Sequence, residues 1–547
     1  MGKIIACLAY TAAAFRLESP KMSRNWFLIG TLVLICAPLT SSAARACQSV
    51  EEYSLTGCVD LWSSAYIRLP SSTVTYFDAR TEKFFTANTD NVEFQRNELH
   101  MTLDQQPKAV SKLLGFPVSW HLELRPWHDS TYDLPNNVGQ GGPRHEFLAD
   151  DLQTNLNGRM ADDYDPLFRE YYLDLRPKHF FIRLGRQIIA WGKSDGVYVL
   201  DILNNFNLVN PEIFDEQQVK IPVWAANINW QINSTYTLQG LFIPQYLPTY
   251  YAGVQIQHGY PIQGGYGDFT YNSTAYFNNI LNGQFGFKIP SQTNLPSTRL
   301  NNWIYGARFS NGSAGDLHYT LNYLYTYTTT MIAYPGNTST FLTATTAAWR
   351  PHRMQVAGGS LDYDWDTGNK WLDGTVFRAE SAVNNGDVYY EGTVGNPVDV
   401  THWQFMGGID KTILGDQLER PVFASFQYYQ DWVVARNNRC ACGPHSNEFQ
   451  DLGFDGSNAG FRGVYKSVST LYLEKTWLPG DFVGSSLAVV HDWQFDDWWV
   501  KPEVTYQFND KTAFVLGFDI FAGSKATPYG EFTNNSNVYF AIHRVLL

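Results

Sequence analysis

The residues best placed to do chemistry in this chain are charged side chains around one loop. Arg183 and Arg186 lie in an alternating apolar and polar stretch, and the sequence after it carries Asp195, Asp201 and Asp215. Whichever arginine faces the interior can pair with one of these aspartates, because a buried charge needs a partner. The chemistry predicted is electrostatic: ion pairs that pin a loop against a wall.

The loop itself, residues 197–221, is half apolar and about as long as two strands. A segment of this composition can fold into the interior of a barrel and narrow it. It would act there either as a gate on a solute path or as a structural brace. We favour the brace, because the ion pairs are needed for stability in both cases.

A second group of acidic residues runs Asp362-Tyr363-Asp364-Trp365-Asp366. A calcium-binding EF-hand loop needs glycine at its sixth position and glutamate at its twelfth. The glycine here comes at 368, and Asp373 stands where the glutamate should be. Alternation instead places Asp362 and Asp364 on one strand face, and we interpret both as polar residues of a lumen or its rim.

Four cysteines are candidates for disulfides. Cys47 and Cys58 are spaced for a short disulfide loop, and Cys440 and Cys442 lie in a polar segment. Disulfides are expected in an oxidising cell envelope. The second pair lacks the further cysteine pair that a zinc site would need, so the sequence predicts no metal site and no cofactor.

The sequence offers little support for an enzyme or a nucleic-acid-binding protein. The chain contains no G-x-S-x-G, H-E-x-x-H, P-loop or dinucleotide-binding motif, and we expect no enzymatic activity. Its 39 Lys and Arg against 52 Asp and Glu give a formal net charge of -13, with no basic stripe for phosphates. A nucleic-acid partner is therefore not expected.

The elements that must position these residues are strands. From about Phe94 to Leu547, stretches of about ten residues with period-2 alternation come in pairs. About 9–11 tilted residues suffice for a strand to cross a bilayer. Tight turns such as Pro177-Lys178 and Asn233-Ser234 join the members of a pair, and long polar loops such as 136–166 separate the pairs. This order is typical of an outer-membrane β-barrel, with short periplasmic turns and long extracellular loops.

The strand count follows from the same alternation. Both termini of such a barrel lie in the periplasm, which requires an even number of strands and places one further strand within about 60–80. The prediction is an all-β transmembrane barrel of about 18 antiparallel strands. In the segment 514–521, Phe514, Leu516, Phe518 and Ile520 share one wholly apolar face, which should contact lipid.

The N-terminus predicts export. A basic segment, the apolar run 26–37 and Ala44-Arg45-Ala46 together resemble a signal peptide and its cleavage site. Residues 1–46 are thus a leader, with Met22 as an alternative start. Residues 47–547 form one barrel domain, whose first part, 47–60, is a short periplasmic or lumenal segment.

Two stretches carry a family resemblance. The run RLGRQIIAWGKSDG from Arg183, with VLDILN after it, and KIPVWAANINW from Lys220 resemble a large uncharacterised outer-membrane β-barrel family of Gram-negative bacteria, distantly related to alginate-export porins. The resemblance is strongest over Leu167–Leu241. It departs from the usual barrel ending in having Leu547 where an aromatic residue is common.

The resemblance implies a barrel in the outer membrane that passes a hydrophobic or lipid-like compound. The partners implied are outer-membrane lipids, a hydrophobic small molecule or lipid as cargo, and periplasmic or inner-membrane transport proteins. Two alternatives stay open. One is a general diffusion porin, and the other is a barrel sheath or scaffold around a partner such as a multihaem electron carrier.

Overall fold

The computed structural model describes the following residues: 48–50, 54–68, 72–78, 83–89, 92–129, 168–208, 219–251, 254–257, 260–263, 292–293, 295–312, 317–329, 332–335, 347–366, 368, 373–391, 396–413, 420–437, 465–477, 482–523, 529–530, 533 and 536–546. Two compact units divide the chain, Met1–Ala44 and Arg45–Leu547, and every described residue belongs to the second. The leader 1–46, Cys47, Asp215, Cys440 and Cys442 lie outside the described residues.

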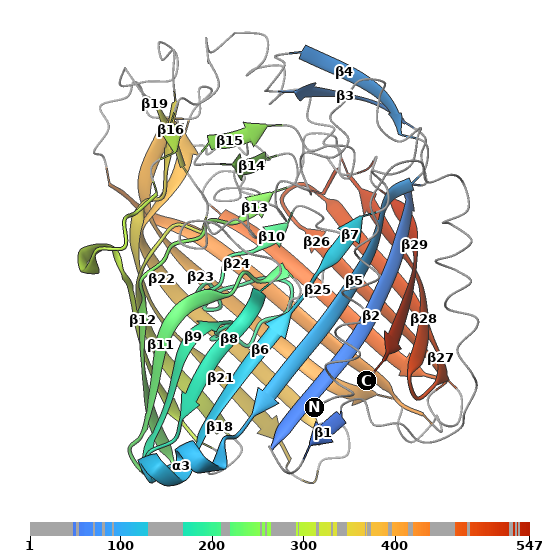
Figure 1. Ribbon diagram of the computed structural model, residues 1–547. Coiled ribbons are helices and arrows are strands. Elements are labelled where there is room, and N and C mark those ends of the chain that lie inside the picture. Colours follow the sequence, from blue (N-terminus) through green and yellow to red (C-terminus); the bar gives the residue numbers. More distant parts are fainter. Residues whose placement is uncertain are drawn as a thin grey trace. The chain divides into compact units, whose positions relative to one another are not determined.

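Antiparallel strands form one closed sheet (Figure 1). Its members are β2 (Leu55–Arg68), β5 (Val92–Gln105), β6 (Val118–Leu124), β7 (Trp127–Asp129), β8 (Phe168–Leu175), β9 (Phe180–Gln187), β11 (Val223–Gln231), β12 (Tyr236–Ile243), β17 (Ile304–Asn311), β18 (Leu317–Tyr327), β21 (Arg353–Trp365), β22 (Thr375–Glu391), β23 (Asn396–Ile413), β24 (Val422–Asn437), β25 (Tyr465–Thr476), β26 (Val483–Asp492), β27 (Asp497–Asn509), β28 (Thr512–Ala522) and β29 (Asn537–Val545).

The ring closes between its last and first strands. β29 pairs with β2 from Asp60↔Val545 to Arg68↔Asn537, and β2 pairs on its other edge with β5. Because β6 and β7 both pair with β5 and occupy one position in the ring, the wall has 18 strands. The predicted fold class and strand number are confirmed, and the strand predicted within 60–80 is β2.

Smaller elements complete the described part of the chain. A short strand β1 (Gln48–Val50) pairs with the start of β2, which places residues 55–60 in the wall. A helix α3 (Lys108–Leu114) connects β5 to β6 and ends at Gly115, whose φ of 78° is the left-handed conformation that glycine adopts readily at a helix end. A 3-10 helix, η3 (Leu300–Asn302), precedes β17.

Among the described residues, three small sheets lie outside the ring pairing. They consist of β3 (Ser72–Asp78) and β4 (Lys83–Thr89); β10 (Asn207–Leu208), β13 (Tyr250–Tyr251), β14 (Val254–Gln257) and β15 (Tyr260–Gln263); and β16 (Gln292–Thr293), β19 (Ile332–Pro335) and β20 (Ala347–Arg350). In the part of the chain that the structure describes, no helix is long and apolar enough to cross a membrane.

The two faces of the wall differ as the alternation predicts. On β28, Leu516, Phe518 and Ile520 are 37–48% exposed, whereas Asp519 and Phe521 between and beside them are buried. Exposed apolar residues in register continue this outer belt onto other strands: Phe180, Leu184, Trp224, Trp230, Leu238, Phe242, Leu321, Leu361, Ile409, Phe426, Val504 and Phe540. An outer face of apolar side chains is what a barrel in lipid requires.

The end of one wall strand is set by side chains that replace its neighbour in the sheet. Strand β9 ends at Gln187, because side chains of Glu170 and Asn204 accept hydrogen bonds from the next backbone amides, those of Ile188 and Ile189.

Candidate functional site: the lumenal segment

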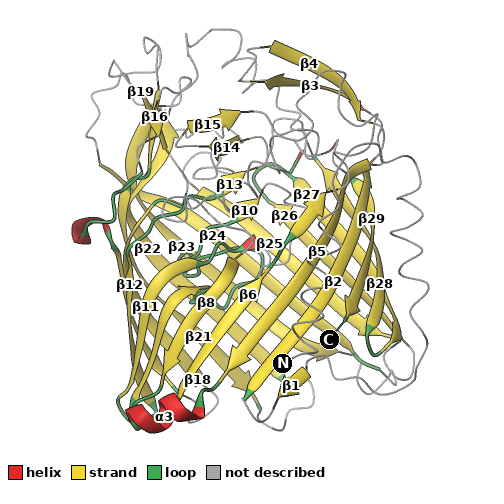
Figure 2. Cartoon of the chain, in the orientation of Figure 1, coloured by secondary structure: helices red, strands yellow, loops and turns green. Residues whose placement is uncertain are grey.

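Between β9 and β11, residues 188–208 and 219–222 leave the wall and pack against the inner face of the barrel (Figure 2). Trp191, Val199 and Leu200 are at most 2% exposed. They share one apolar cluster with inner-wall residues of nine strands: Val223, Ala225, Leu241, Ile243, Ile304, Leu324, Met354, Val356, Ala382, Met406, Tyr429 and Val468. We call residues 188–208 and 219–222 the lumenal segment. Its burial removes apolar area from the water of the lumen, which is the main force that holds it.

Glu380 on β22 is the principal polar anchor of this segment. Its carboxylate accepts hydrogen bonds from the backbone amides of Lys193, Ser194 at 3.0 Å and Leu200 at 3.2 Å. The residue is 1% exposed. One buried carboxylate thus satisfies three amides that have left the ladder of the wall, and hydrogen bonds to an ionised acceptor are stronger than neutral ones.

A second anchor surrounds Arg378, also on β22. Its Nη1 lies 2.7 Å from Asp195 Oδ2, and its Nε lies 2.7 Å from Asp410 Oδ2. Gln427 donates to the Asp195 carboxylate at 2.9 Å and accepts from the Asp195 amide at 3.0 Å. These contacts join the lumenal segment to three neighbouring strands, β22, β23 and β24.

A third contact lies one strand away. Lys193 Nζ is 3.3 Å from the carboxylate of Asp362 on β21. Asp362 therefore faces the lumen and contacts the segment, whereas Asp364, two residues further on, is exposed.

The segment also has internal polar contacts. Lys220 and Asp201 form an ion pair in which both side chains are at most 5% exposed. Asp201 accepts the Trp191 amide at 3.2 Å as well, and Asn204 bridges the two ends of the segment through the Ile189 amide and the Ile221 carbonyl, both at 2.7 Å.

Glycines in the wall make room for the largest side chains of the segment. A Cβ on Gly306 would lie 2.8 Å from the end of the Trp191 ring, and one on Gly358 would lie 2.9 Å from Leu200. Trp191 also donates its indole N–H to Gln239 at 2.9 Å. The lumenal segment is therefore positioned by close packing against glycines of the wall as well as by ion pairs.

One of the two arginines predicted to pin the loop, Arg183, has a partner in the wall. Arg183 forms a two-point ion pair with Asp174 on the adjacent strand β8, with N–O distances of 2.8 and 3.0 Å, and stacks over Tyr172 at 3.7 Å. Arg186 is buried, in register with Tyr171 and Trp224. Arg183 therefore pairs within the wall, and the pairing of Arg186 with a loop aspartate stays a prediction.

Two of the loop aspartates pair with cations that the sequence did not suggest. Asp195 pairs with Arg378 and Asp201 with Lys220. No sequence signal points to Arg378, which lies 183 residues after Asp195 and meets it only because the barrel closes. Of the cysteine candidates, Cys58 is disulfide-bonded.

A cavity of about 710 Å³ lies at the short-turn end of the inner wall. Its lining is mostly polar and comes from the first strands of the barrel: Ser54, Leu55, Thr56, Asp104, Gln105, Gln106, Lys108, Ser119, Trp120, His121, Tyr172, Asp174, Arg176 and Arg183. Charges of both signs therefore face the solvent at this end.

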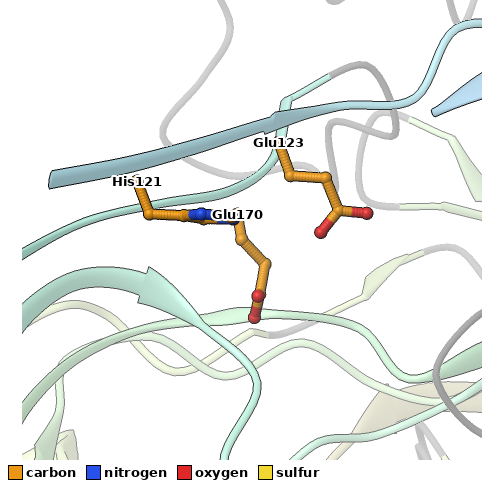
Figure 3. A group of neighbouring side chains, drawn as sticks. All are labelled: His121, Glu123 and Glu170. Carbon is orange, nitrogen blue, oxygen red and sulfur yellow. The ribbon is translucent and has the colours of Figure 1, made fainter. Parts of the chain in front are cut away.

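Next to this cavity, three potential metal ligands converge: His121 and Glu123 on β6 and Glu170 on β8 (Figure 3). One ligand atom from each lies within 4.8 Å of the others. Sequence reasoning missed this group. His121 and Glu123 are two positions apart and must share a strand face, but nothing in the sequence shows that Glu170 is in register with them.

The closed ring of 18 strands, its outer apolar belt and the short turns at one end define a transmembrane β-barrel of the outer membrane. A family model described as a protein of unknown function, DUF1302, matches residues 43–408, which is more than half of the chain. The protein therefore belongs to the DUF1302 family.

No curated protein matches the chain. Among solved structures, it is similar to OccK5 (OpdH) of Pseudomonas aeruginosa, with 8% identity, 90% of this chain and 98% of that chain covered, and a TM-score of 0.38. It is similar to a BenF-like porin from Pseudomonas fluorescens Pf-5, with 10% identity, coverage of 90% and 98%, and a TM-score of 0.41. A third is OccAB1 of Acinetobacter baumannii, with 9% identity, coverage of 92% and 99%, and a TM-score of 0.41.

Proposed function

We propose that this protein is an outer-membrane channel whose pore is narrowed by the lumenal segment. The observation that carries the proposal is the attachment of that segment to the inner wall through Glu380. Barrels of eighteen strands are wide enough for an aqueous channel unless something fills them. A segment fixed to one side of the lumen reduces the cross-section, and the solute passes beside it.

The lining favours small hydrophilic solutes. The apolar residues of the inner wall, such as Leu241 and Met406, are covered by the lumenal segment and are at most 1% exposed. The residues that face the 710 Å³ cavity are mainly polar or charged. A hydrophobic or lipid-like cargo, expected from the family resemblance, would need the reverse arrangement, and we therefore prefer the diffusion-channel alternative.

The same geometry bears on the sheath alternative and on the expected partners. A sheath around a protein partner would need the volume that the lumenal segment occupies, which argues against it. Under this proposal the protein is not an enzyme. Outer-membrane lipids contact the outer belt, and periplasmic or inner-membrane partners and the distant relation to alginate-export porins stay predictions.

The test is the conductance of the purified, detergent-folded protein in planar lipid bilayers, combined with swelling of liposomes in small sugars and amino acids. The proposal predicts stepwise currents and swelling that falls with solute size. The folded state of the protein is checked by the change in its gel mobility on heating. If the folded protein shows neither currents nor swelling, the proposal is refuted. Lipid retained in native mass spectra of such a protein would support the hydrophobic cargo instead.

A further inference from the structure

We propose that His121, Glu123 and Glu170 form a binding site for one divalent transition-metal ion, of the kind of Zn²⁺, on the inner wall of the barrel. The three side chains come from two paired strands, β6 and β8. One imidazole and two carboxylates are a ligand set that zinc accepts in proteins, with water or another ligand in the fourth position.

The register makes the two carboxylates neighbours. Glu123 and Glu170 are directly paired across the strands. Like charges in this position destabilise a sheet unless something compensates them. Arg169 provides part of the compensation, since its Nε lies 3.5 Å from Glu123. A divalent cation between the two carboxylates would relieve the rest of the repulsion.

A β-bulge places Arg169 beside this group. The register shifts between Glu123 and Leu124, so that Leu124 pairs with Phe168 and Arg169 is the additional residue. Bulges of this kind redirect side chains and occur often beside functional sites.

The imidazole is already oriented by a second carboxylate. His121 Nδ1 hydrogen-bonds with Asp104 Oδ1 at 2.8 Å, and the ring stacks on Tyr172 with 4.8 Å between centroids. A carboxylate on one ring nitrogen fixes the tautomer and leaves the other nitrogen, Nε2, for a metal. This arrangement, carboxylate to histidine to metal, is independent of the proximity of the two glutamates.

The site fits the ion with small adjustments. Ligands at about 2.0–2.2 Å from zinc lie roughly 3–4 Å from one another, and the three ligand atoms here lie within 4.8 Å. Side-chain rotations suffice for the difference. His121 and Glu123 side chains are 15% and 18% exposed, so that an ion can enter from the lumen.

Glu170 links the site to the lumenal segment. Its Oε1 accepts the backbone amide of Ile188, the first residue after β9. The second oxygen of the same carboxylate is left for the metal. Metal binding would therefore fix the position at which the segment leaves the wall.

The test is titration of the metal-free protein with Zn²⁺ by calorimetry and with Co²⁺ by visible absorption, in detergent after chelator treatment. The wild type should bind one Zn²⁺ per chain. His121→Gln and Glu123→Gln should lose this binding. Asp104→Asn should retain the stoichiometry with affinity weakened by about 10–100-fold, as for other partners of a metal-bound histidine.

His543→Gln is the matched control, because His543 lies on the inner wall stacked on Trp62, away from the three ligands. It should bind Zn²⁺ as the wild type does. Unchanged binding in His121→Gln, no binding by the folded wild type, or a Co²⁺–thiolate charge-transfer band from a cysteine site would each overturn the proposal. Calorimetry and absorption measure Zn²⁺ and Co²⁺ binding independently of conductance. Failure of the metal site can therefore be told apart from failure of the channel proposal.

Discussion

Replacement of Glu380 by alanine should release the lumenal segment from the barrel wall. The carboxylate accepts the amides of Lys193, Ser194 and Leu200, and the alanine side chain offers none of them an acceptor. Each buried amide left without a partner costs about 1–3 kcal/mol. The segment can avoid that cost by moving into the lumen, where water satisfies the amides.

The size of the effect follows from these numbers. Three amides give a sum of roughly 3–9 kcal/mol, and because neighbouring contacts are not additive we expect a value near the lower end. A change of about 3 kcal/mol shifts the ratio of released to bound segment about a hundredfold, since about 1.4 kcal/mol corresponds to a factor of ten.

Two assays follow the release. Single-channel recording of Glu380→Ala should show larger current fluctuations and a changed mean conductance. Trypsin should cleave after Lys193 at a much higher rate, because proteolysis tracks the population of the open form. Glu474→Ala is the matched control: Glu474 is an exposed residue whose carboxylate accepts from Tyr472 at 3.1 Å.

The reasoning fails if Glu380→Ala behaves like the wild type and the Glu474→Ala control in both assays. A changed cleavage rate with unchanged conductance would show that the segment is held by Glu380 but lies outside the solute path, which is the brace interpretation.

Three further predictions concern the packing of Trp191 on Gly306, the ion pair inside the lumenal segment and the disulfide of Cys58. Gly306→Val should displace the indole that packs on this glycine and raise trypsin sensitivity of the segment, because even a Cβ would lie 2.8 Å from the ring. Lys220→Met should lower the free energy of unfolding by about 3–5 kcal/mol, since it leaves Asp201 buried without its cation, and adding Asp201→Asn should recover part of the loss in urea unfolding. Cys58, which is disulfide-bonded, should be found linked to Cys47 in non-reducing peptide mass spectra.

Each of these predictions has a result that contradicts it. Gly240→Val is the control for Gly306→Val, because a Cβ there would lie 3.7 Å from its nearest neighbour, the ring of Phe242. Equal trypsin sensitivity of the two variants would show that Trp191 does not depend on close packing against Gly306. Full additivity of the two ion-pair substitutions would show that the charges are not coupled. A peptide joining Cys58 to Cys440 or Cys442 would refute the N-terminal pairing.

The wall of the barrel could be predicted from sequence because its signal is local. Alternation on the segment 514–521 identifies which residues face lipid, and turn residues such as Pro177-Lys178 mark where strands reverse. The same local rules supplied the strand number, since the order of short turns and long loops requires an even count.

The attachment of the lumenal segment could not be predicted, because it depends on contacts across the barrel. Glu380 is 187 residues from Lys193 in sequence, and only closure of the ring brings the two together. Arg183 illustrates the same limit at short range: alternation places it on the inner face, but the register of β8 and β9 decides that its partner is Asp174. The metal ligands on β6 and β8 were missed for this reason too.

The central claim, that the lumenal segment lies against the inner wall of a closed barrel, can be tested most directly by zero-length crosslinking. Lys193 Nζ and the Asp362 carboxylate are 3.3 Å apart, so carbodiimide treatment of the folded protein in lipid should produce a peptide that joins Lys193 to Asp362, absent in Asp362→Asn. Exclusive crosslinking of Lys193 to acidic residues of the long loops would contradict the account.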